Sequence, residues 1–143
     1  MNELSDQLKV ALASVFAMYL KAHNFHWNVT GPDFAQYHAF LGTVYDELHD
    51  SVDVYAEQIR TLDSVAPGGL ARYYELSVID DANDVPAGVQ MLRNLSIDNG
   101  KMLDELYAAA EMAEALNKRG IVNFLEDRIM YHDKLGWMLR SFS

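Results

Sequence analysis

The stretch FAQYHAFLGTVYDELHDSVDVYAEQIRTL, residues 34–62, determines the fold class of this chain. One side of it is marked by residues that recur at steps of three and four, the spacing of one face of an α-helix. These residues are Phe34, His38, Leu41, Tyr45, Leu48, Val52, Tyr55, Ile59 and Leu62. At 1.5 Å per residue, a helix over 33–62 is about 45 Å long and spans a whole domain.

The preceding residues follow the same pattern. Between positions 4 and 28 the stripe consists of Leu4, Leu8, Ala11, Val15, Met18, Ala22 and Phe25. Thr30-Gly31-Pro32-Asp33 interrupts it, and glycine and proline are typical of helix ends and of first turns. The pattern therefore predicts two long helices joined by a short corner.

A long connection follows. Residues 63–84 contain Pro67-Gly68-Gly69 and a run of aspartates, which indicates a crossover, and 72–79 is expected to form a short helix within it. Asp84 and Pro86 then mark the start of another helix. The four long helices predicted are 4–28, 33–62, 85–117 and 120–141. The expected fold is all-α, a ferritin-like four-helix bundle with a long crossover (short extra helix) between helices 2 and 3, in a single domain over 1–143.

Composition restricts the function classes. Apolar residues make up 50% of the chain but form no run near the ~20 residues of a membrane-spanning helix. The start MNELSDQLKV has no secretory signal and the chain has no cysteine, which predicts a cytoplasmic location. The formal net charge of -10 repels phosphate backbones, so direct nucleic-acid binding is disfavoured.

Four side chains suit a metal ion. His26 ends the first helix, His38 lies on the stripe of the second, and Asp53 and Glu57 stand one turn apart further along it. Imidazole with carboxylate is a ligand set for iron, manganese or zinc. His38 and Glu57 are 19 positions apart, roughly 28 Å along one helix, so one chain cannot bring both to one ion. A shared site requires the second helix to pack antiparallel against its copy in a two-fold dimer.

The alternative is a metal site inside one bundle, which expects a Glu-x-x-His pair on each of two helices. The nearest match is the single run Asp46-Glu47-Leu48-His49, which is more typical of a solvated helix face. Each histidine also has a structural interpretation as a hydrogen-bonded core residue, and this is the role we expect for His132.

Several runs of sequence resemble one family. They are NFHWNVTGPDF at 24–34, Tyr37-His38, YDEL at 45–48, VDVYAEQIRTL at 52–62 and the segment from Lys134 to Leu139. Over nearly the whole chain the sequence is similar to the Dps miniferritins, the DNA-binding proteins from starved cells. The resemblance implies a hollow shell of twelve subunits in which ferrous iron is oxidised, preferably by hydrogen peroxide, and stored as ferric mineral.

The resemblance also implies roles for individual residues. His26 and His38 of one chain face Asp53 and Glu57 of its dimer mate, an arrangement that the helix geometry requires independently. Trp27 corresponds to a tryptophan beside the site that can give up an electron, with packing as its alternative role. Trp137, in the last helix, is expected in the core.

The sequence departs from the family pattern at three places. Gly42 stands where many relatives carry an acidic residue that assists a second metal position, which implies a weaker second iron site. Asn123 replaces an aspartate of the iron-entry pore, with Glu126 and Asp127 as candidate substitutes. Residues 1–7 contain two acids and no Lys or Arg, unlike the Lys-rich DNA-binding tail of the family, so we expect no appreciable DNA binding at physiological salt.

Two other functions stay open. One is a non-catalytic, shell-forming structural protein built on the same dimer with its metal site unused. The other is a relative that places zinc or manganese in the same site, because the order of metal affinities does not select iron. The presence of all four candidate ligands favours ferrous-iron oxidation over the structural role.

Overall fold

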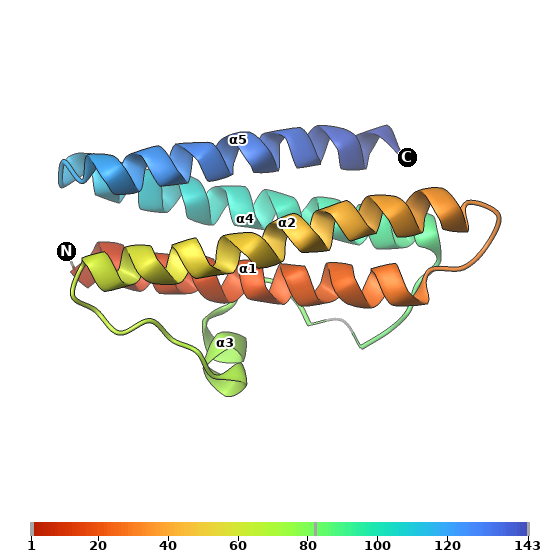
Figure 1. Ribbon diagram of the computed structural model, residues 1–143, viewed down its shortest axis with the longest axis horizontal. Helices are drawn as coiled ribbons and strands as arrows, with labels where there is room; N and C mark the ends of the chain where they lie inside the picture. Colours follow the sequence, from red (N-terminus) through yellow and green to blue (C-terminus); the bar gives the residue numbers. More distant parts are fainter. Residues whose placement is uncertain (1, 82, 143) are drawn as a thin grey trace.

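Four long helices and one short helix make up the fold in the computed structural model, which describes residues 2–81 and 83–142. They are α1 (Asn2–Asn28), α2 (Phe34–Thr61), α3 (Leu70–Leu76), α4 (Gly88–Ala115) and α5 (Arg119–Ser141). The long helices lie side by side as a bundle, and α3 lies outside it, next to α1 (Figure 1). The predicted all-α four-helix bundle is confirmed, and the described residues contain no strand.

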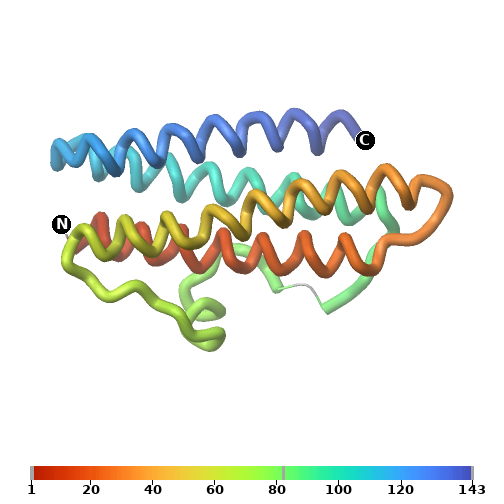
Figure 2. The backbone as a smooth tube through the Cα atoms, viewed as in Figure 1, coloured from red at the N-terminus to blue at the C-terminus, as the bar shows by residue number. Residues whose placement is uncertain are grey.

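The connections determine the direction of each helix. α1 and α2 form one antiparallel pair, and α4 and α5 form the other (Figure 2). The crossover that contains α3 returns the chain to the end of the bundle where α2 begins, so α2 and α4 run in the same direction. In the part of the chain described, no helix has both the length and the hydropathy of a membrane-spanning segment.

The predicted apolar stripes form the core. The α1 residues Leu4, Leu8, Ala11, Val15, Met18, Ala22 and Phe25 are all buried. From α2, the buried members of the stripe are Leu41, Leu48, Tyr55 and Ile59. Full burial of one such large apolar side chain contributes roughly 1.5–3 kcal/mol. His38 is only partly buried, so it lies at the edge of its stripe and not within the core.

Two helices in the second half differ from their predicted boundaries. The short helix is Leu70–Leu76 rather than 72–79, and α4 begins at Gly88 rather than at 85. Because a residue before proline is driven out of the helical region, Pro86 keeps the preceding backbone extended. At Gly88 the backbone also approaches the Tyr37 ring, and a Cβ there would lie 2.5 Å from Tyr37 Cδ2. The chain therefore enters the bundle at the glycine.

Trp137 was expected in the core, and this was wrong because its side chain is 58% exposed. The buried face of α5 is formed by Ile121, Leu125, Arg128, His132, Leu135, Gly136 and Leu139. Trp137 comes two positions after Leu135, about 200° around the helix, and therefore points away from that face.

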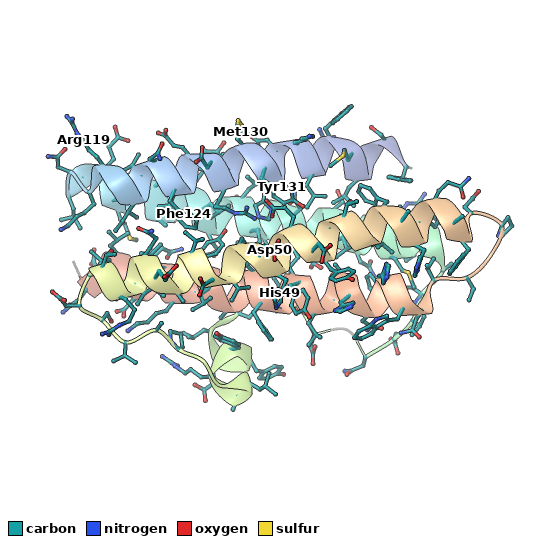
Figure 3. The ribbon with its side chains drawn as sticks, viewed as in Figure 1. His49, Asp50, Arg119, Phe124, Met130 and Tyr131 are labelled. Atoms are coloured by element: carbon teal, nitrogen blue, oxygen red, sulfur yellow. The ribbon has the colours of Figure 1, made fainter. Side chains whose placement is uncertain are left out.

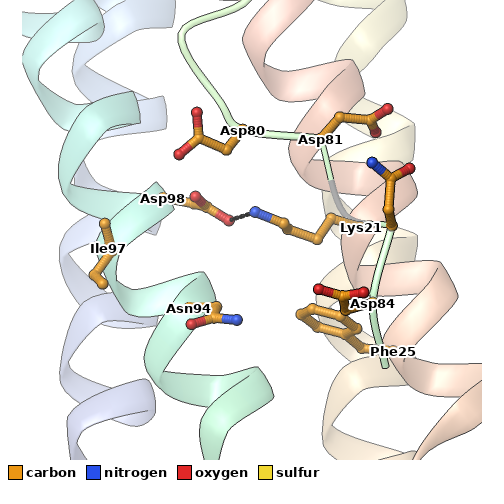
Figure 4. A pocket seen from close by; sticks show the side chains of 9 residues that line it. Lys21, Phe25, Asp80, Asp81, Asp84, Asn94, Ile97 and Asp98 are labelled. Carbon is orange, nitrogen blue, oxygen red and sulfur yellow. Dashed lines mark hydrogen bonds and ion pairs between the residues drawn. The ribbon is translucent and has the colours of Figure 1, made fainter. Parts of the chain in front are cut away.

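A buried ion pair joins α1 to α4. Lys21 Nζ lies 2.9 Å from Asp98 Oδ2, and the two side chains are 8% and 4% exposed. Figure 4 shows this pair among the side chains that line a pocket, together with Asp80, Asp81 and Asp84 from the crossover. Burial raises the pKa of Asp98, and the hydrogen bond from Lys21 only partly offsets that effect. The pair therefore depends on both partners.

His132 has the structural role expected from the sequence. It is fully buried on α5, its Nδ1 lies 2.7 Å from Asn99 Oδ1, and its backbone oxygen accepts a hydrogen bond from Asn99 Nδ2. Burial, with a smaller contribution from nearby Arg128, lowers its pKa from 6.5 to about 3. The ring is therefore neutral in the folded chain throughout the physiological pH range.

This histidine makes stability fall as the solution becomes more acidic. Below pH 6.5 the His132 ring takes up a proton in the unfolded chain but stays neutral in the folded chain. The contribution of His132 to the free energy of unfolding is therefore lost progressively between pH 6.5 and about pH 3. We expect about 2 kcal/mol less unfolding free energy at pH 5 than at pH 7 from this residue, at about 1.4 kcal/mol per unit. Urea denaturation of the wild type and of His132→Gln at both pH values measures it. Equal losses in the two proteins would contradict the assignment.

Candidate metal-binding site

His26 and His38 meet where the chain passes from α1 to α2. His26 lies in the last turn of α1 and His38 in the second turn of α2, and their rings stack with centroids 3.8 Å apart. His26 Nδ1 lies 2.7 Å from the backbone oxygen of His38, and His38 Nδ1 lies 2.8 Å from that of His26. The backbone of each residue therefore holds the ring of the other.

These two contacts decide which nitrogen of each ring carries the proton. A carbonyl oxygen only accepts hydrogen bonds, so both Nδ1 atoms must donate. A neutral imidazole bonded in this way presents Nε2 as an electron-pair donor, the form in which histidine binds metals. The corner thus holds two neighbouring imidazoles with the tautomer and ring orientation that a metal ligand needs.

Gly42 makes room for one of these rings. It lies one turn after His38, and a Cβ at this position would be 3.3 Å from Cε1 and 3.5 Å from Nδ1 of His26. A Cβ here would require the His26 ring to shift by a few tenths of an ångström. The absence of a side chain at Gly42 therefore lets the His26 ring pack closely against α2.

The two candidate carboxylates lie elsewhere in the chain. Asp53 and Glu57 are exposed on α2, which is one unbroken helix, so His38 and Glu57 are about 28 Å apart. Within residues 2–81 and 83–142 of a single chain, no group of three or more His, Cys, Asp or Glu side chains could hold a metal ion. One chain therefore brings His26 and His38 together but leaves Asp53 and Glu57 apart from them.

A buried arginine on α5 reaches across to α2. Arg128 on α5 donates two hydrogen bonds to Glu47, of 2.7 and 2.8 Å, and its guanidinium lies over the rings of Tyr55 and Tyr131. Burial raises the pKa of Tyr55 to about 12, so this phenol stays neutral. In the alternative run Asp46-Glu47-Leu48-His49, the Glu47 carboxylate accepts both hydrogen bonds from Arg128, and the described residues place no group of three potential ligands around it. His49 is exposed near the middle of α2 (Figure 3).

An array of aromatic rings lies beside the histidine pair. His23, one turn before His26, stacks on Tyr45 of α2 at 3.8 Å and 7°, and it packs against Trp27 at 4.0 Å. Its Nδ1 lies 3.1 Å from the hydroxyl oxygen of Tyr19. Burial, followed by the proximity of His26, lowers the pKa of His23 below 6.5. Trp27 is 59% exposed in the single chain, so its contact with His23 covers only part of the indole.

The sequence patterns selected Trp27 and placed Tyr45 on the stripe of the second helix, but they did not select Tyr19 or His23. Tyr19, His23 and Trp27 stand four positions apart on α1 and so share one side of that helix. That spacing is the signal by which Tyr19 and His23 could have been found.

The expected iron-entry residues lie around the start of α5. Asn123 and Glu126 line a surface hollow together with Glu114 and Arg119. Asp127, the other candidate substitute, is exposed but does not line this hollow. The hollow mixes carboxylates with a guanidinium, so it is less acidic than a pore lined by aspartates alone.

Comparison with known proteins identifies the class. The family model of the ferritin-like domain matches residues 5–143, and the chain belongs to this family. A DNA protection during starvation protein from Brevibacillus brevis is 28% identical over 131 residues, which cover 92% of this chain and 88% of that protein.

Solved structures narrow the assignment. Dps from Staphylococcus aureus matches with a TM-score of 0.95 and 28% identity over 99% of this chain and 95% of that one. Dps from Vibrio cholerae, described as a member of a broad superfamily of ferritin-like diiron-carboxylate proteins, matches with a TM-score of 0.95 and 26% identity, covering 99% and 89% of the two chains. The chain is a Dps-type miniferritin.

Proposed function

We propose that this miniferritin oxidises ferrous iron at a site completed by two chains and stores the ferric product, protecting its surroundings from oxidative damage. The observation that carries the proposal is the pair His26 and His38, whose Nδ1 atoms are both bonded to backbone oxygens, so that both Nε2 atoms can donate to a metal. Two imidazoles with two carboxylates form the mixed nitrogen and oxygen set that iron accepts.

The second half of the site comes from a dimer mate in this proposal. If His38 of one chain faces Asp53 and Glu57 of the other across antiparallel copies of α2, the two-fold axis passes close to residues 46 and 47. Asp46, Asp53 and Glu57 are all exposed and lie within about 40° of one another around α2, so one face of the helix carries them. Such an isologous contact generates two identical sites per dimer.

The chemistry follows from the ligands. Iron is the substrate, and the two exposed carboxylates offset the charge of the ferrous ions that bind between the chains. Two ferrous ions each give one electron to hydrogen peroxide, which takes up two protons and leaves as two water molecules. Trp27 follows His26 directly and is proposed as a further electron donor. Zinc or manganese would fit the same ligands, but zinc has no redox chemistry and could not give the electron that this reaction needs.

The assembly belongs to the same proposal. We infer a homo-oligomer built from two-fold dimers, with a shell of twelve subunits around the mineral. The absence of cysteine agrees with a reducing compartment such as the cytoplasm. With a net charge of -10, the chain is proposed not to bind DNA directly, whatever the name of its relative from Brevibacillus brevis.

Stopped-flow absorbance tests the function. Ferrous iron mixed anaerobically with the assembled protein and then with hydrogen peroxide is expected to give a rapid ferric signal, with a slower signal when oxygen replaces peroxide. A protein that assembles normally but yields no ferric signal above the protein-free rate would instead be the non-catalytic, shell-forming relative.

A further inference from the structure

The array beside the histidine pair has a specific order. Tyr45 lies 5.0 Å from His26, ring centre to ring centre, and forms the first step away from the proposed iron site. His23 stacks on Tyr45, and Tyr19 contacts His23 through its hydroxyl. The three side chains thus connect His26 to Tyr19 along the seam between α1 and α2.

The contact between Tyr19 and His23 is a hydrogen bond between two groups that can exchange a proton. The Tyr19 hydroxyl and His23 Nδ1 are 3.1 Å apart, and both residues are partly buried. A phenol that loses an electron becomes a strong acid and must lose its proton at the same time. An imidazole nitrogen at hydrogen-bond distance is positioned to take that proton.

Apolar packing alone does not require a hydroxyl at this place on α1. The neighbouring ring of Phe16, whose centroid lies 5.6 Å from that of Tyr19, packs against Tyr73 without one. A phenol hydrogen-bonded to an imidazole, which is itself stacked at 7° on a second phenol ring, offers a route for electrons as well as a contact surface.

We propose that Tyr19, with His23 as its proton acceptor and Tyr45 as the bridge, supplies an electron to the iron site. The inference rests on the proposed ferrous-iron oxidation and adds a reductant to it. It applies when peroxide meets a site that holds one ferrous ion. The iron gives one electron, Tyr19 gives the second, and the phenolic proton passes to His23 Nδ1. Peroxide takes both electrons with two protons from solvent and leaves as two water molecules.

The products are therefore one ferric ion, one neutral Tyr19 phenoxyl radical and one protonated His23. Without the second electron, one ferrous ion would cleave peroxide to hydroxide and a free hydroxyl radical. The array converts that damaging outcome into a radical held on a partly buried ring.

Freeze-quench electron paramagnetic resonance tests the inference. The assembled protein, labelled with ring-deuterated tyrosine, is loaded with one ferrous ion per site and mixed with hydrogen peroxide. The wild type is expected to give a tyrosyl signal that narrows with deuteration, and Tyr19→Phe to lose it. His23→Gln keeps a hydrogen-bond acceptor but no base, so the radical should form about 100-fold more slowly, the lower end of what a positioned base contributes.

Tyr107→Phe is the matched control, because Tyr107 is exposed on α4 away from the array, and it should leave the signal unchanged. A signal that survives Tyr19→Phe, or is lost only in Tyr45→Phe, overturns the assignment. Ferric iron formed at the normal rate with no tyrosyl signal refutes this inference and leaves the proposed function standing. Absence of ferric iron in the wild type refutes both.

Discussion

The double substitution His26→Ala with His38→Ala is expected to slow rapid ferrous-iron oxidation by more than about 100-fold. Loss of a single hydrogen-bond partner of a metal ligand already costs roughly 10–100-fold in metal affinity or activity, and here both nitrogen ligands are removed. Both proposed nitrogen donors disappear, and Asp53 and Glu57 of the mate then face an empty corner. Stopped-flow absorbance at equal protein concentration gives the rate.

The fold should survive this change. Two hydrogen bonds between α1 and α2 are lost, at about 1 kcal/mol each, while the buried stripe of leucines between the helices remains. A control that truncates another hydrogen-bonded surface pair, Gln90→Ala with Asn94→Ala on α4, should keep the wild-type rate. If the double histidine variant assembles and still oxidises iron at the wild-type rate, the corner is not the site.

Lys21→Met is expected to produce the largest loss of stability, about 3–5 kcal/mol at neutral pH, because it leaves Asp98 charged and buried without a partner. The double variant Lys21→Met with Asp98→Leu should recover most of that loss, since replacing a whole buried pair by apolar groups is often neutral. Urea denaturation of the three proteins measures it. A loss below about 1 kcal/mol in the single variant would contradict the burial argument.

The same variant carries a pH signature. Burial holds the pKa of Asp98 above its unfolded value even with Lys21 present, and removal of Lys21 should raise it further. A carboxyl with a raised folded pKa costs stability as pH rises through that pKa, so the destabilisation by Lys21→Met should shrink as the solution is made more acidic. Repeating the titrations at pH 5 tests the sign.

The helix pattern was predictable because α-helical periodicity is a local property. The stripe that begins at Leu4 is buried throughout, whereas the stripe that begins at Phe34 contributes Leu41, Leu48, Tyr55, Ile59 and Leu62 to the core and leaves Phe34 exposed. The close approach of Gly88, at the start of α4, to the Tyr37 ring was not predictable in the same way, since the two residues are distant in sequence. The predicted burial of Trp137 was wrong for a different reason. Tryptophan is a residue type that favours burial, but position 137 lies on the exposed side of α5.

In the candidate site, too, the local features were predictable from the sequence and the contacts between distant residues were not. Residue types and spacing were enough to select His26 and His38, but the reciprocal bonds between their rings and backbones depend on the geometry of the corner. The need for a second chain came from simple helix length. The link from Tyr19 to His23 could not be read from spacing, because helical spacing places two rings on one side without deciding whether they bond.

Complementation between two inactive variants tests most directly whether the site is shared by two chains. One variant carries His26→Ala with His38→Ala, and the other carries Asp53→Asn with Glu57→Gln. Co-expressed in equal amounts, they form mixed dimers in which one of the two sites is complete, so about one quarter of the wild-type rate of iron oxidation should return. If the mixture stays as inactive as each variant alone while mixed dimers are present, the two-chain site is wrong.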